Sequence, residues 1–596
     1  MFERAAQLWR FAKFGLPVAR LRPDAPRTLG DVIEEQAIAR AGRPFILFED
    51  RKVTYDELNR EANRVAHWAR AHGLGRGHRV ALLMQNRPEF LEIWAGLAKA
   101  GVTTALINTN LSGRALEHAL ATADAKHWIV GAECLGLCDG IDTGRWQLWV
   151  ATEPGAPVPK LPAGALELGS ELATRPSANL PPGSRDESRA GDDLFYIYTS
   201  GTTGLPKAAR FSHLRFMTAG TAARLAGFGP ESTMYCALPL YHTAGGCMAV
   251  GAALLSGGAV ALRRRFSARE FWPDVRRYQA TSFQYIGEFC RYLLNQPDDA
   301  ADGQHALEFC IGNGLRPDIW ESFRDRFRIP RIVEFYGATE GNVSLLNLDN
   351  KSGSVGRIPT RLLMDARLVR YDVERDEHPR DAQGHLIECG ADEVGELIGA
   401  LPKSKTSTRG RFEGYTSSEA TERKILRNAF APGDSFFRTG DLLRQDTQGY
   451  FYFVDRIGDT FRWKGENVST QEVAEALASF PGLDMVNVYG VAVPGADGRA
   501  GMAALIVSGK EDFDPRAFYA HAVTALPAYA VPVFVRLQRE AEVTGTFKLR
   551  KVDLQQEGYD PARVSDPLFV RDDGARTYAP LDADAFARIS AGEIRV

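Results

Sequence analysis

Several features that would mark a specialised class of protein are scarce in this chain of 596 residues. The formal net charge is only −3, and binding to nucleic acid requires a clear basic excess, so nucleic acid is not expected as a partner. The seven cysteines include one close pair, Cys134 and Cys138, with no second pair to complete a zinc site. We therefore expect reduced thiols in a cytoplasmic protein.

Long uninterrupted apolar runs are also scarce. The first 22 residues interleave charges with apolar side chains and lack the clean apolar core of a secretory signal. Residues 238–262 contain no Asp, Glu, Lys or Arg and are long enough to cross a bilayer, but Pro239, His242 and five glycines interrupt them. The pattern predicts a buried helix followed by a buried strand rather than a membrane span.

The first 22 residues leave two interpretations open. Aromatic residues alternate there with an excess of cations, which are Arg4, Arg10, Lys13, Arg20 and Arg22. A basic amphipathic segment of this kind can lie as a peripheral contact on the anionic inner face of a membrane. The alternative is a short helix that packs on the protein's own body and is interrupted by Gly15 and Pro17. We favour this alternative because the segment is short for a membrane-surface helix.

The remaining pattern predicts more than one domain, because the length exceeds what a single hydrophobic core usually supports. Residues 79–84 and 102–108 have the pattern of buried strands, and residues 88–101 between them have that of a helix. This alternation predicts parallel sheets covered by helices. An irregular connection at residues 152–192 precedes a new strand that begins at Asp193.

The predicted fold class is α/β. We expect a large N-terminal domain of parallel or mixed sheets flanked by helices over residues 1–455, after the strand-like run that ends near Asp455. A small, mobile C-terminal α/β domain is expected over residues 456–596, which is a suitable length for one such domain.

The strongest local signal is the segment YTSGTTGLPK at residues 198–207, directly after a strand pattern. Its glycines allow backbone amides to approach a phosphate, its hydroxyls can donate hydrogen bonds, and Lys207 supplies positive charge. A Walker loop needs adjacent Gly and Lys, whereas Leu205 and Pro206 stand between Gly204 and Lys207. The preceding strand and the residue order favour a phosphate cradle over a merely flexible loop; its residues are Thr199, Ser200, Gly201, Thr202, Thr203, Gly204 and Lys207.

This segment resembles the phosphate-binding loop of the adenylate-forming superfamily, which includes acyl-CoA synthetases, peptide-synthetase adenylation domains and luciferases. Four more segments follow in the family's order, namely FYGATEGN at 335–342, RTGDL at 438–442, DRIGDTFRWKGENVS at 455–469 and TFKLRK at 546–551. They resemble, in turn, the adenine and magnesium motif, the ribose motif, the interdomain hinge and the catalytic-lysine strand. The resemblance extends over roughly residues 29–551. The residues within these motifs are most similar to those of the very-long-chain acyl-CoA synthetase and fatty-acid-transport-protein branch.

The residues of the adenine motif also have chemical reasons of their own. Tyr336, followed by Gly337, offers a flat face for adenine, although a core tyrosine is common after an apolar strand. Thr339 can donate a hydrogen bond to a phosphate oxygen. Glu340 can ligate Mg2+, which ATP chemistry requires, and its place after a Gly-Ala turn argues against an ordinary surface acid.

Three further positions complete the expected nucleotide site. Asp441 can accept hydrogen bonds from two ribose hydroxyls, and Arg456 can reach the ribose or the phosphates. The turn formed by Gly312, Asn313 and Gly314 is poor in side chains, so a purine could approach it, but an ordinary structural turn explains it equally well.

Two elements near the expected acyl pocket have open interpretations. His242 matches the family's position between the nucleotide and acyl pockets, but a lone histidine is as often structural. Residues 281–294 are apolar with helical spacing and could form a pocket wall or an ordinary core helix. The run Arg263, Arg264 and Arg265 is favoured as a solvated strand edge over a site for coenzyme A phosphates.

The resemblance implies a catalytic set of Lys548, Glu340, Thr199 and His242, with the metal on Glu340. It also implies that the C-terminal domain rotates between two half-reactions. Gly458 stands where relatives often carry Asp or Lys, so Asp459 is a second candidate for the hinge. The strand-like alternation around Lys548 places Lys551 on the opposite face, and its loss is expected to be mild.

The function implied is an ATP-dependent, long- or very-long-chain fatty acyl-CoA synthetase that uses ATP, Mg2+ and coenzyme A. Three alternatives stay open: a fatty acyl-AMP ligase that delivers to a carrier protein, a coenzyme A ligase for a polar, carnitine-like acid, and a membrane-associated component of fatty-acid uptake. No side-chain nucleophile is needed, in agreement with the lack of a convincing Ser/His/Asp or Cys/His set. A homodimer is a further hypothesis.

Overall fold

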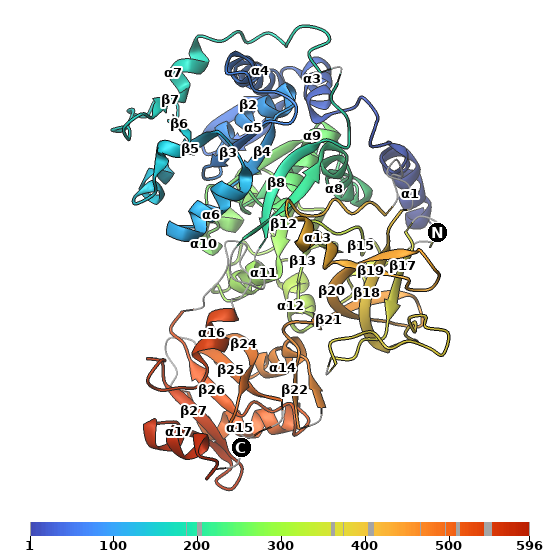
Figure 1. Cartoon of the computed structure of the whole chain (residues 1–596), viewed down its shortest axis with the longest axis vertical. Helices are drawn as coiled ribbons and strands as arrows, with labels where there is room; N and C mark the ends of the chain where they lie inside the picture. The colour runs from blue at the N-terminus through green and yellow to red at the C-terminus, as the bar shows by residue number, and fades with distance from the viewer. Residues whose placement is uncertain are drawn as a thin grey trace.

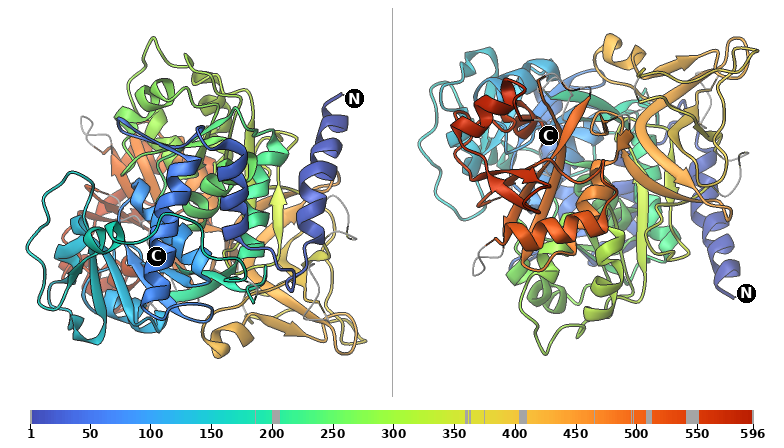
Figure 2. Two further views of the ribbon diagram at one scale, coloured as in Figure 1. Left: turned by 90° about the horizontal axis from the view of Figure 1, so that it is seen from above. Right: turned by 90° about the horizontal axis from the view of Figure 1, so that it is seen from below.

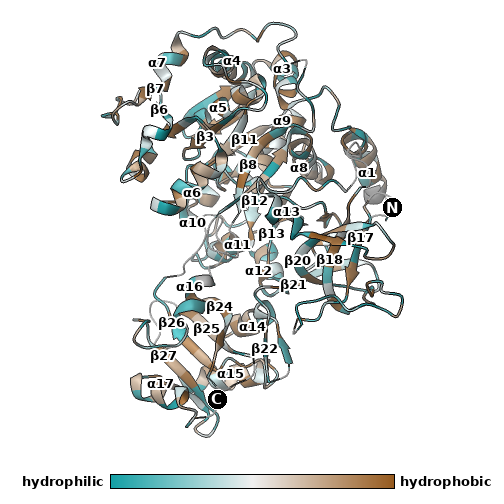
Figure 3. Ribbon diagram, viewed as in Figure 1, coloured by the Kyte–Doolittle hydropathy of each residue, from teal (hydrophilic) through white to brown (hydrophobic). Residues whose placement is uncertain are grey.

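The structure is a computed structural model that describes residues 2–594 apart from 186, 200–205, 359–360, 362–363, 374, 403–409, 465, 495, 497, 508–512 and 541–550, with only the backbone described at 2–4 and 552. A large lobe contains about the first three quarters of the chain, and the C-terminal elements form a second, smaller lobe below it (Figure 1). Strands in both lobes are largely hydrophobic, as Figure 3 shows. The predicted α/β class is confirmed.

The first sheet of the large lobe is parallel except at one edge. Its strand order is β7-β6-β5-β3-β4-β8-β9, and only the pair β8–β9 is antiparallel. The predicted strand–helix–strand unit is present as β3, α5 (Pro88–Ala100) and β4. The strands of this sheet are β7 (Leu166–Glu167), β6 (Gln147–Ala151), β5 (His127–Gly131), β3 (Arg79–Leu83), β4 (Thr103–Leu106), β8 (Asp193–Thr199) and β9 (Lys207–Ser212).

The second sheet is larger and changes character at β14, which pairs in parallel with β13 and antiparallel with β15. In sheet order its strands are β17 (Ala366–Val369), β18 (Val394–Ala400), β20 (Ser435–Gln445), β21 (Tyr450–Arg456), β16 (Gly356–Arg357), β15 (Ser344–Leu346), β14 (Ile332–Gly337), β13 (Phe309–Asn313), β12 (Ser282–Ile286), β10 (Thr233–Cys236), β11 (Ala259–Leu262), β1 (Pro44–Phe48) and β2 (Arg51–Thr54), with β19 (Ile425–Arg427) on β20. The carboxyl ends of β12, β13 and β14 therefore meet at one edge, where ligands usually bind in open α/β sheets.

Helices cover the two sheets of the large lobe, and most of them share one hydrophobic core, whereas α6 packs in a separate cluster on the first sheet. Their starts are set by local signals: Thr28 and Thr54 each form a capping box with a carboxylate three residues on, at the starts of α3 and α4. The helices are α3 (Leu29–Arg40), α4 (Tyr55–Ala71), α6 (Gly113–Ala123), α7 (Leu168–Ala173), α8 (His213–Ala226), α10 (Ala268–Arg277), α12 (Pro317–Arg326) and α13 (Ser418–Glu422).

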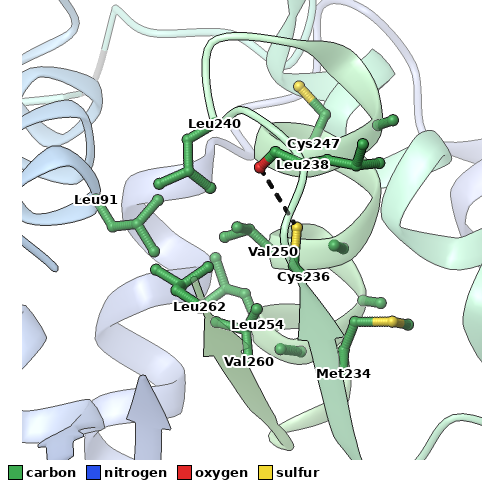
Figure 4. Packing of buried hydrophobic residues seen from close by; sticks show 14 of the residues in the cluster. Leu91, Met234, Cys236, Leu238, Leu240, Cys247, Val250, Leu254, Val260 and Leu262 are labelled. Carbon is green, nitrogen blue, oxygen red and sulfur yellow. Dashed lines mark hydrogen bonds between the residues drawn. The ribbon is translucent and has the colours of Figure 1, made fainter. Parts of the chain in front are cut away.

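The uncharged segment 238–262 lies in this core, as the sequence predicts. It forms the π-helix η4 (Thr243–Ala249), the helix α9 (Val250–Ser256) and the strand β11. Figure 4 shows Leu91 of α5 directed toward Leu240, Leu254 and Leu262 of this segment. Within the described ranges, no helix combines the length and the apolar character needed to cross a membrane.

The prediction of a helix over residues 281–294 is wrong in its first half. Residues Ser282–Ile286 form the buried strand β12, and the helix α11 spans only Gly287–Leu294. Every residue of β12 is buried, and a strand that is buried on both faces has no alternation to distinguish it from a helix.

The N-terminal residues pack on the protein's own body, which is the interpretation favoured above. The helix α1 (Phe2–Arg10), the π-helical turn η1 (Phe11–Gly15) and α2 (Leu16–Arg20) lie beside α8 at the edge of the molecule (Figure 2). The helical path continues through Gly15 and Pro17, with the π-helical turn η1 directly before α2. Leu8 and Trp9 remain 71% and 57% exposed.

The smaller lobe begins after β21 and has a hydrophobic core of its own, which extends from Phe461 to Ile589. A two-stranded sheet precedes a five-stranded sheet in the order β24-β25-β26-β27-β28. Its elements are β22 (Phe461–Trp463), β23 (Glu466–Val468), α14 (Thr470–Ala478), β24 (Leu483–Ala492), β25 (Arg499–Val507), α15 (Pro515–Ala525), β26 (Phe534–Leu537), α16 (Val552–Glu557), β27 (Leu568–Asp572), β28 (Thr577–Pro580) and α17 (Ala583–Ser590). The domain boundary at 455/456 and the mobility of this lobe stay predictions.

Candidate functional site

Three of the residues expected to bind the nucleoside lie together. The pairing of β20 with β21 sets Asp441 opposite Arg456, whose Nε lies 3.8 Å from Asp441 Oδ1. The hydroxyl of Tyr336, on β14, donates a hydrogen bond of 2.6 Å to Asp441 Oδ2. Burial and the Asp441 charge raise the pKa of Tyr336, so its hydroxyl stays a donor. An aromatic ring near the end of β14, a carboxylate within β20 and a guanidinium at the end of β21 thus converge.

The turn Gly312-Asn313-Gly314 lies at the end of β13, directly beside this group. Its conformation is held by Glu334, a buried carboxylate two residues before Tyr336: Glu334 Oε1 accepts a hydrogen bond of 3.0 Å from Leu315 N, and the Tyr285 hydroxyl donates to Oε2. Burial raises the pKa of Glu334 to about 8. Gly314 has a φ of +80°, a conformation that favours glycine. Glu334 stands in none of the sequence motifs, although strand alternation places it on the same face as Tyr336.

Glu340 and Thr339 follow β14. Thr339 Oγ1 lies 3.1 Å from Thr243 Oγ1, at the start of η4. Glu340 is 8% exposed, and its Oε1 accepts a 2.5 Å hydrogen bond from the hydroxyl of Tyr415, a residue 75 positions later that the sequence analysis did not select. No local pattern distinguishes Tyr415, because it meets Glu340 only through the tertiary fold.

The structure describes only the two ends of the phosphate cradle. Thr199 ends β8 and pairs with Lys207, which begins β9, so the two ends of the expected loop lie side by side in the β-hairpin that β8 and β9 form. Ser200, Gly201, Thr202, Thr203 and Gly204 lie outside the described residues. The segment Gly414–Thr416 runs beside β9, since Arg210 N donates to Gly414 O at 3.1 Å and Thr416 N to Ala208 O at 3.0 Å. This pairing connects the hairpin to Tyr415 and hence to Glu340.

His242 caps the N-terminus of η4: its Nδ1 accepts a long hydrogen bond of 3.5 Å from Ala244 N. Gly245 and Gly246 allow the tight packing of this turn, because a Cβ on Gly246 would lie 2.0 Å from Leu240 O. π-Helical turns are rare and frequently mark functional sites. The structure therefore gives His242 a capping contact next to Thr243, and its gating role stays a prediction.

The ribose motif rests on a buried carboxylate that was also missed. Glu396 of β18 is fully buried, accepts a hydrogen bond of 2.9 Å from Gly440 N, and lies 3.1 Å from the Arg438 guanidinium and 2.6 Å from His378 Nε2. Burial alone would raise the pKa of Glu396, but the hydrogen bond from His378 and the charge of Arg438 hold it below its usual range. These contacts fix the turn that presents Asp441.

The expected hinge contains a compact polar cluster, which we call the hinge cluster: Asp455, Asp459, Thr470 and Lys551. Thr470 donates to the buried carboxylate of Asp455 through its N at 2.6 Å and its Oγ1 at 3.0 Å. Lys551 Nζ donates to Thr470 Oγ1 at 2.6 Å and lies 3.3 Å from Asp459 Oδ2. A Cβ added at Gly458 would meet no atom of the described residues within 4 Å, so this side of the turn is open.

Lys548 lies outside the described residues, so its placement is not known from the structure. The assignment of Lys551 to an opposite strand face is wrong, because Lys551 is the N-cap residue of α16 and is held in the hinge cluster. The alternating sequence pattern could not reveal this, because the partner Thr470 lies 81 positions earlier in the chain. The mild effect expected for the loss of Lys551 stays a prediction.

A magnesium ion fits the residues present. Across the part of the chain that the structure describes, no three His, Cys, Asp or Glu side chains cluster to enclose a metal. Mg2+ in nucleotide enzymes is commonly held by one or two carboxylates together with substrate phosphates. Glu340, beside the hairpin expected to hold the phosphates, is suited to that arrangement.

Comparison with known proteins identifies the family. The model of the AMP-binding enzyme family matches residues 33–391. The chain is 42% identical over 618 residues to long-chain fatty acid transport protein 1 of Mus musculus, an alignment that covers 98% of this chain and 93% of that protein. It is 37% identical over 599 residues to the human long-chain fatty acid transport protein 6, which covers 99% of this chain and 95% of the relative.

Solved structures share the fold at lower identity. An anthranilate CoA ligase in complex with anthranoyl-AMP superposes with a TM-score of 0.75 at 22% identity, over 90% of this chain and 98% of that one. A fatty acyl CoA synthetase of Mycobacterium tuberculosis has a TM-score of 0.62 at 23% identity, over 89% of this chain and 98% of that one. These likenesses concern the arrangement of the two lobes.

Proposed function

This chain belongs to the AMP-binding enzyme family of adenylate-forming ligases, and from that premise we propose that it is an ATP-dependent fatty acyl-CoA synthetase for long- or very-long-chain acids. The observation that supports this most directly is the convergence of Tyr336, Asp441 and Arg456, with Glu340 four residues after Tyr336 in the chain. This group offers a stacking face, a ribose acceptor and a cation next to a metal-binding carboxylate.

The proposed reaction has two halves. In the first, an oxygen of the substrate carboxylate attacks the α-phosphorus of ATP, the bond to the β-phosphate oxygen breaks, and pyrophosphate leaves an acyl-adenylate behind. In the second, the thiol of coenzyme A loses its proton and attacks the acyl carbon, and AMP leaves with the electrons of the broken acyl–oxygen bond. The first half brings two anions together, so electrostatic stabilisation is its main requirement.

Each site residue has a proposed part in this sequence. Tyr336 stacks on adenine, while Asp441 binds the ribose hydroxyls and Arg456 reaches the ribose or phosphates. The hairpin that starts at Thr199 and ends at Lys207 holds the phosphates, and Lys548 stabilises the reacting carboxylate and α-phosphate. Mg2+, held by Glu340, would neutralise part of the polyphosphate charge.

An apolar acid is favoured by the surroundings of His242. The segment that follows it, η4 and α9, is entirely uncharged and largely buried, and Leu254 of α9 packs near Leu91 of α5 and Leu262 of β11. The relatives at about 40% identity carry long-chain fatty acids in their names, which supports the same substrate class here. A polar, carnitine-like acid would find no charged partner along this segment.

The deciding experiment measures pyrophosphate release from ATP across a panel of acids: acetate, benzoate, carnitine, and fatty acids of 8 to about 24 carbons. We expect release to rise with chain length and to require Mg2+. Coenzyme A is then added to the isolated acyl-adenylate complex, and thioester formation is followed. Release only with the polar acid, or an acyl-adenylate that coenzyme A leaves intact but a carrier protein consumes, would contradict the proposal.

A peripheral membrane contact remains a second, separate proposal. Leu8 and Trp9 are exposed on α1 while Lys13 lies over the Trp9 ring at 4.5 Å, so an aromatic and a cation face outward together. Such a face suits the anionic inner leaflet. Flotation with vesicles of 30% phosphatidylserine, compared with the L8S/W9S variant, tests this contact; equal flotation of both forms would refute it. Light scattering of the same samples tests the homodimer hypothesis.

A further inference from the structure

The hydrogen bond between Tyr415 and Glu340 joins two parts of the site that are distant in sequence. Glu340 follows β14 of the larger sheet, whereas Tyr415 lies on a segment that runs along β9 of the other sheet. The bond is short, at 2.5 Å, which is typical of a hydroxyl that donates to a charged oxygen. The Tyr415 hydroxyl donates this bond and the Glu340 carboxylate accepts it.

The backbone of Tyr415 and of its two neighbours is held by hydrogen bonds, which helps to position the phenol. Tyr415 N donates to Thr421 Oγ1 at 3.0 Å, and the flanking residues Gly414 and Thr416 each pair with β9. Tyr415 itself forms an antiparallel bridge with Ala209. The position of the hydroxyl is therefore determined by the strand that leaves the phosphate hairpin, only two residues beyond Lys207.

The surroundings of Glu340 are also ordered on its other side. Arg215 is partly buried, donates to Ala338 O at 2.8 Å, and adds positive charge near both Glu340 and Glu413. Glu413 in turn accepts hydrogen bonds from Ser212 at the end of β9. The groups around the Glu340 carboxylate thus belong to β9 and to α8, the helix after it, or to the segment that pairs with β9.

We propose that Tyr415 is a positioning residue for the metal-binding carboxylate. Its hydroxyl occupies one oxygen of Glu340 with a hydrogen bond, so the cation is bound through the other oxygen. The carboxylate is thereby held at a fixed distance from the phosphate hairpin. Mg2+ demands a near-octahedral arrangement and is usually bound by a single oxygen of a carboxylate, and groups that orient a ligand contribute to metal affinity. This inference rests on the proposed function, since it assumes that Glu340 binds the cation of the metal–ATP complex.

The competing explanation is that Tyr415 only stabilises the fold. A purely structural tyrosine would lower the thermal midpoint when its hydroxyl is removed, but it would leave the affinity for a metal–nucleotide complex unchanged. If Tyr415 positions Glu340, the loss of its hydroxyl weakens the affinity for the metal–nucleotide complex, and it does so only while the Glu340 carboxylate is present. The two explanations are separated by a double-mutant cycle.

The experiment uses the full chain and measures binding of Mn2+ in the presence of ATP by electron paramagnetic resonance, without acid or coenzyme A. We expect Y415F to weaken Mn2+ binding about tenfold, within the range found for residues that orient metal ligands. E340Q should weaken it at least as much, and Y415F/E340Q should be no weaker than E340Q. The Mg2+ concentration for half-maximal pyrophosphate release should shift in parallel for each variant.

A matched control is Y519F, in the smaller lobe. Tyr519 also donates to a carboxylate, Asp573, at 3.0 Å, so its loss removes the same type of bond away from the site. Y519F should bind Mn2+ as the wild type does. Wild-type affinity in Y415F, or an additional loss in the double variant equal to that of Y415F alone, would overturn the inference while E340Q still supports the proposed function. Absence of metal-dependent ATP binding in the wild type, or an unaltered E340Q, would overturn both.

Discussion

The residues expected to bind the nucleotide, which are Tyr336, Asp441, Arg456 and Glu340 and which we call the nucleotide group, are held differently from the hinge cluster. Tyr336, Asp441 and Glu340 each make side-chain hydrogen bonds within the large lobe, and Tyr336 and Asp441 lie on β14 and β20 of one sheet. In the hinge cluster, Asp455 precedes Gly458 while Thr470 and Lys551 follow it. The first group is preorganised within one body, whereas the second holds contacts that a rotation about Gly458 would have to break.

This difference has a kinetic consequence. Changes in the nucleotide group should weaken both half-reactions, because ATP and the acyl-adenylate share the same adenosine. Changes in the hinge cluster, or in a residue that rotation brings in and out, should affect the halves unequally. The variants below test the distinction from the largest expected effect to the smallest.

The largest effect is expected for Lys548→Ala. Removal of one preorganised charged group at the reacting atoms costs on the order of a hundredfold or more in rate, so acyl-adenylate formation should collapse. Thioester formation from synthetic acyl-AMP and coenzyme A should largely persist. Rapid-quench assays of the two halves measure this, with the exposed Lys160→Ala as the control. Equal losses in both halves of a well-folded variant would remove Lys548 from the catalytic set.

Asp441→Ala should come next, and it should weaken both halves together. Hydrogen bonds to a charged group contribute about 1.5–3 kcal/mol, which corresponds to a rise of roughly 10- to 150-fold in the KM for ATP. Tyr336→Phe keeps the ring and removes only the hydroxyl that bonds Asp441, so its KM should rise less. Initial rates at varied ATP and at varied synthetic acyl-AMP decide the matter. A change confined to one half would contradict a shared adenosine site.

Gly458→Pro tests the hinge itself. Proline fixes φ near −65° and would hold one orientation of the smaller lobe, so the ratio of the two half-reaction rates should change even where one rate is preserved. Gly458→Ala is the control, because the space around this position accepts a Cβ. If Gly458→Pro lowers both halves by the same factor with the fold intact, the pivot lies elsewhere, and Asp459 is the next position to test.

Lys551→Met should have the smallest effect, and it should depend on pH. Burial raises the pKa of Asp455 above the ordinary value of 3.8, and the charge of Lys551 opposes that shift. The folded state therefore binds a proton more readily than the unfolded state, and this carboxyl lowers stability as pH rises from about 3.8 through its folded pKa. Without Lys551 the folded-state pKa of Asp455 would rise further, so the pH range over which stability falls would extend to higher pH.

The corresponding measurement is thermal unfolding of wild type and Lys551→Met at pH 5 and pH 8. A loss of about 1 kcal/mol, or roughly 2–4 °C for a unit of this size, is expected at pH 8, with a smaller loss at pH 5. A difference that is larger at pH 5 would contradict the role assigned to Lys551 beside Asp455.

Much of the fold and of the nucleotide site could be predicted from the sequence, because both depend on local patterns. The unit β3–α5–β4 follows from periodicity, and Tyr336, Glu340 and Asp441 stand in short motifs whose chemistry is evident from residue type. The strand β12 could not be distinguished from a helix, since it is buried on both faces and has no alternation.

The residues that support the site were missed for a different reason. Tyr415 and Glu396 act through partners that are 75 and 44 positions away, at Glu340 and Gly440. Their sequence neighbourhoods contain only an ordinary tyrosine and an ordinary glutamate. Lys551 was assigned to a strand face by alternation alone, whereas the fold makes it the cap of a helix. Long-range hydrogen bonds of this kind leave no periodic trace in the chain.

The pairing of Gly414–Thr416 with β9 also bears on solubility. β9 is the last strand of its sheet, and an uncovered last strand offers a row of unpaired amides and carbonyls to any other extended chain. The hydrogen bonds at Ala208 and Arg210 occupy part of that row, and the charged side chain of Arg210 is exposed on the same strand. The segment that carries Tyr415 therefore also protects this edge against intermolecular β-pairing, and its removal would favour aggregation.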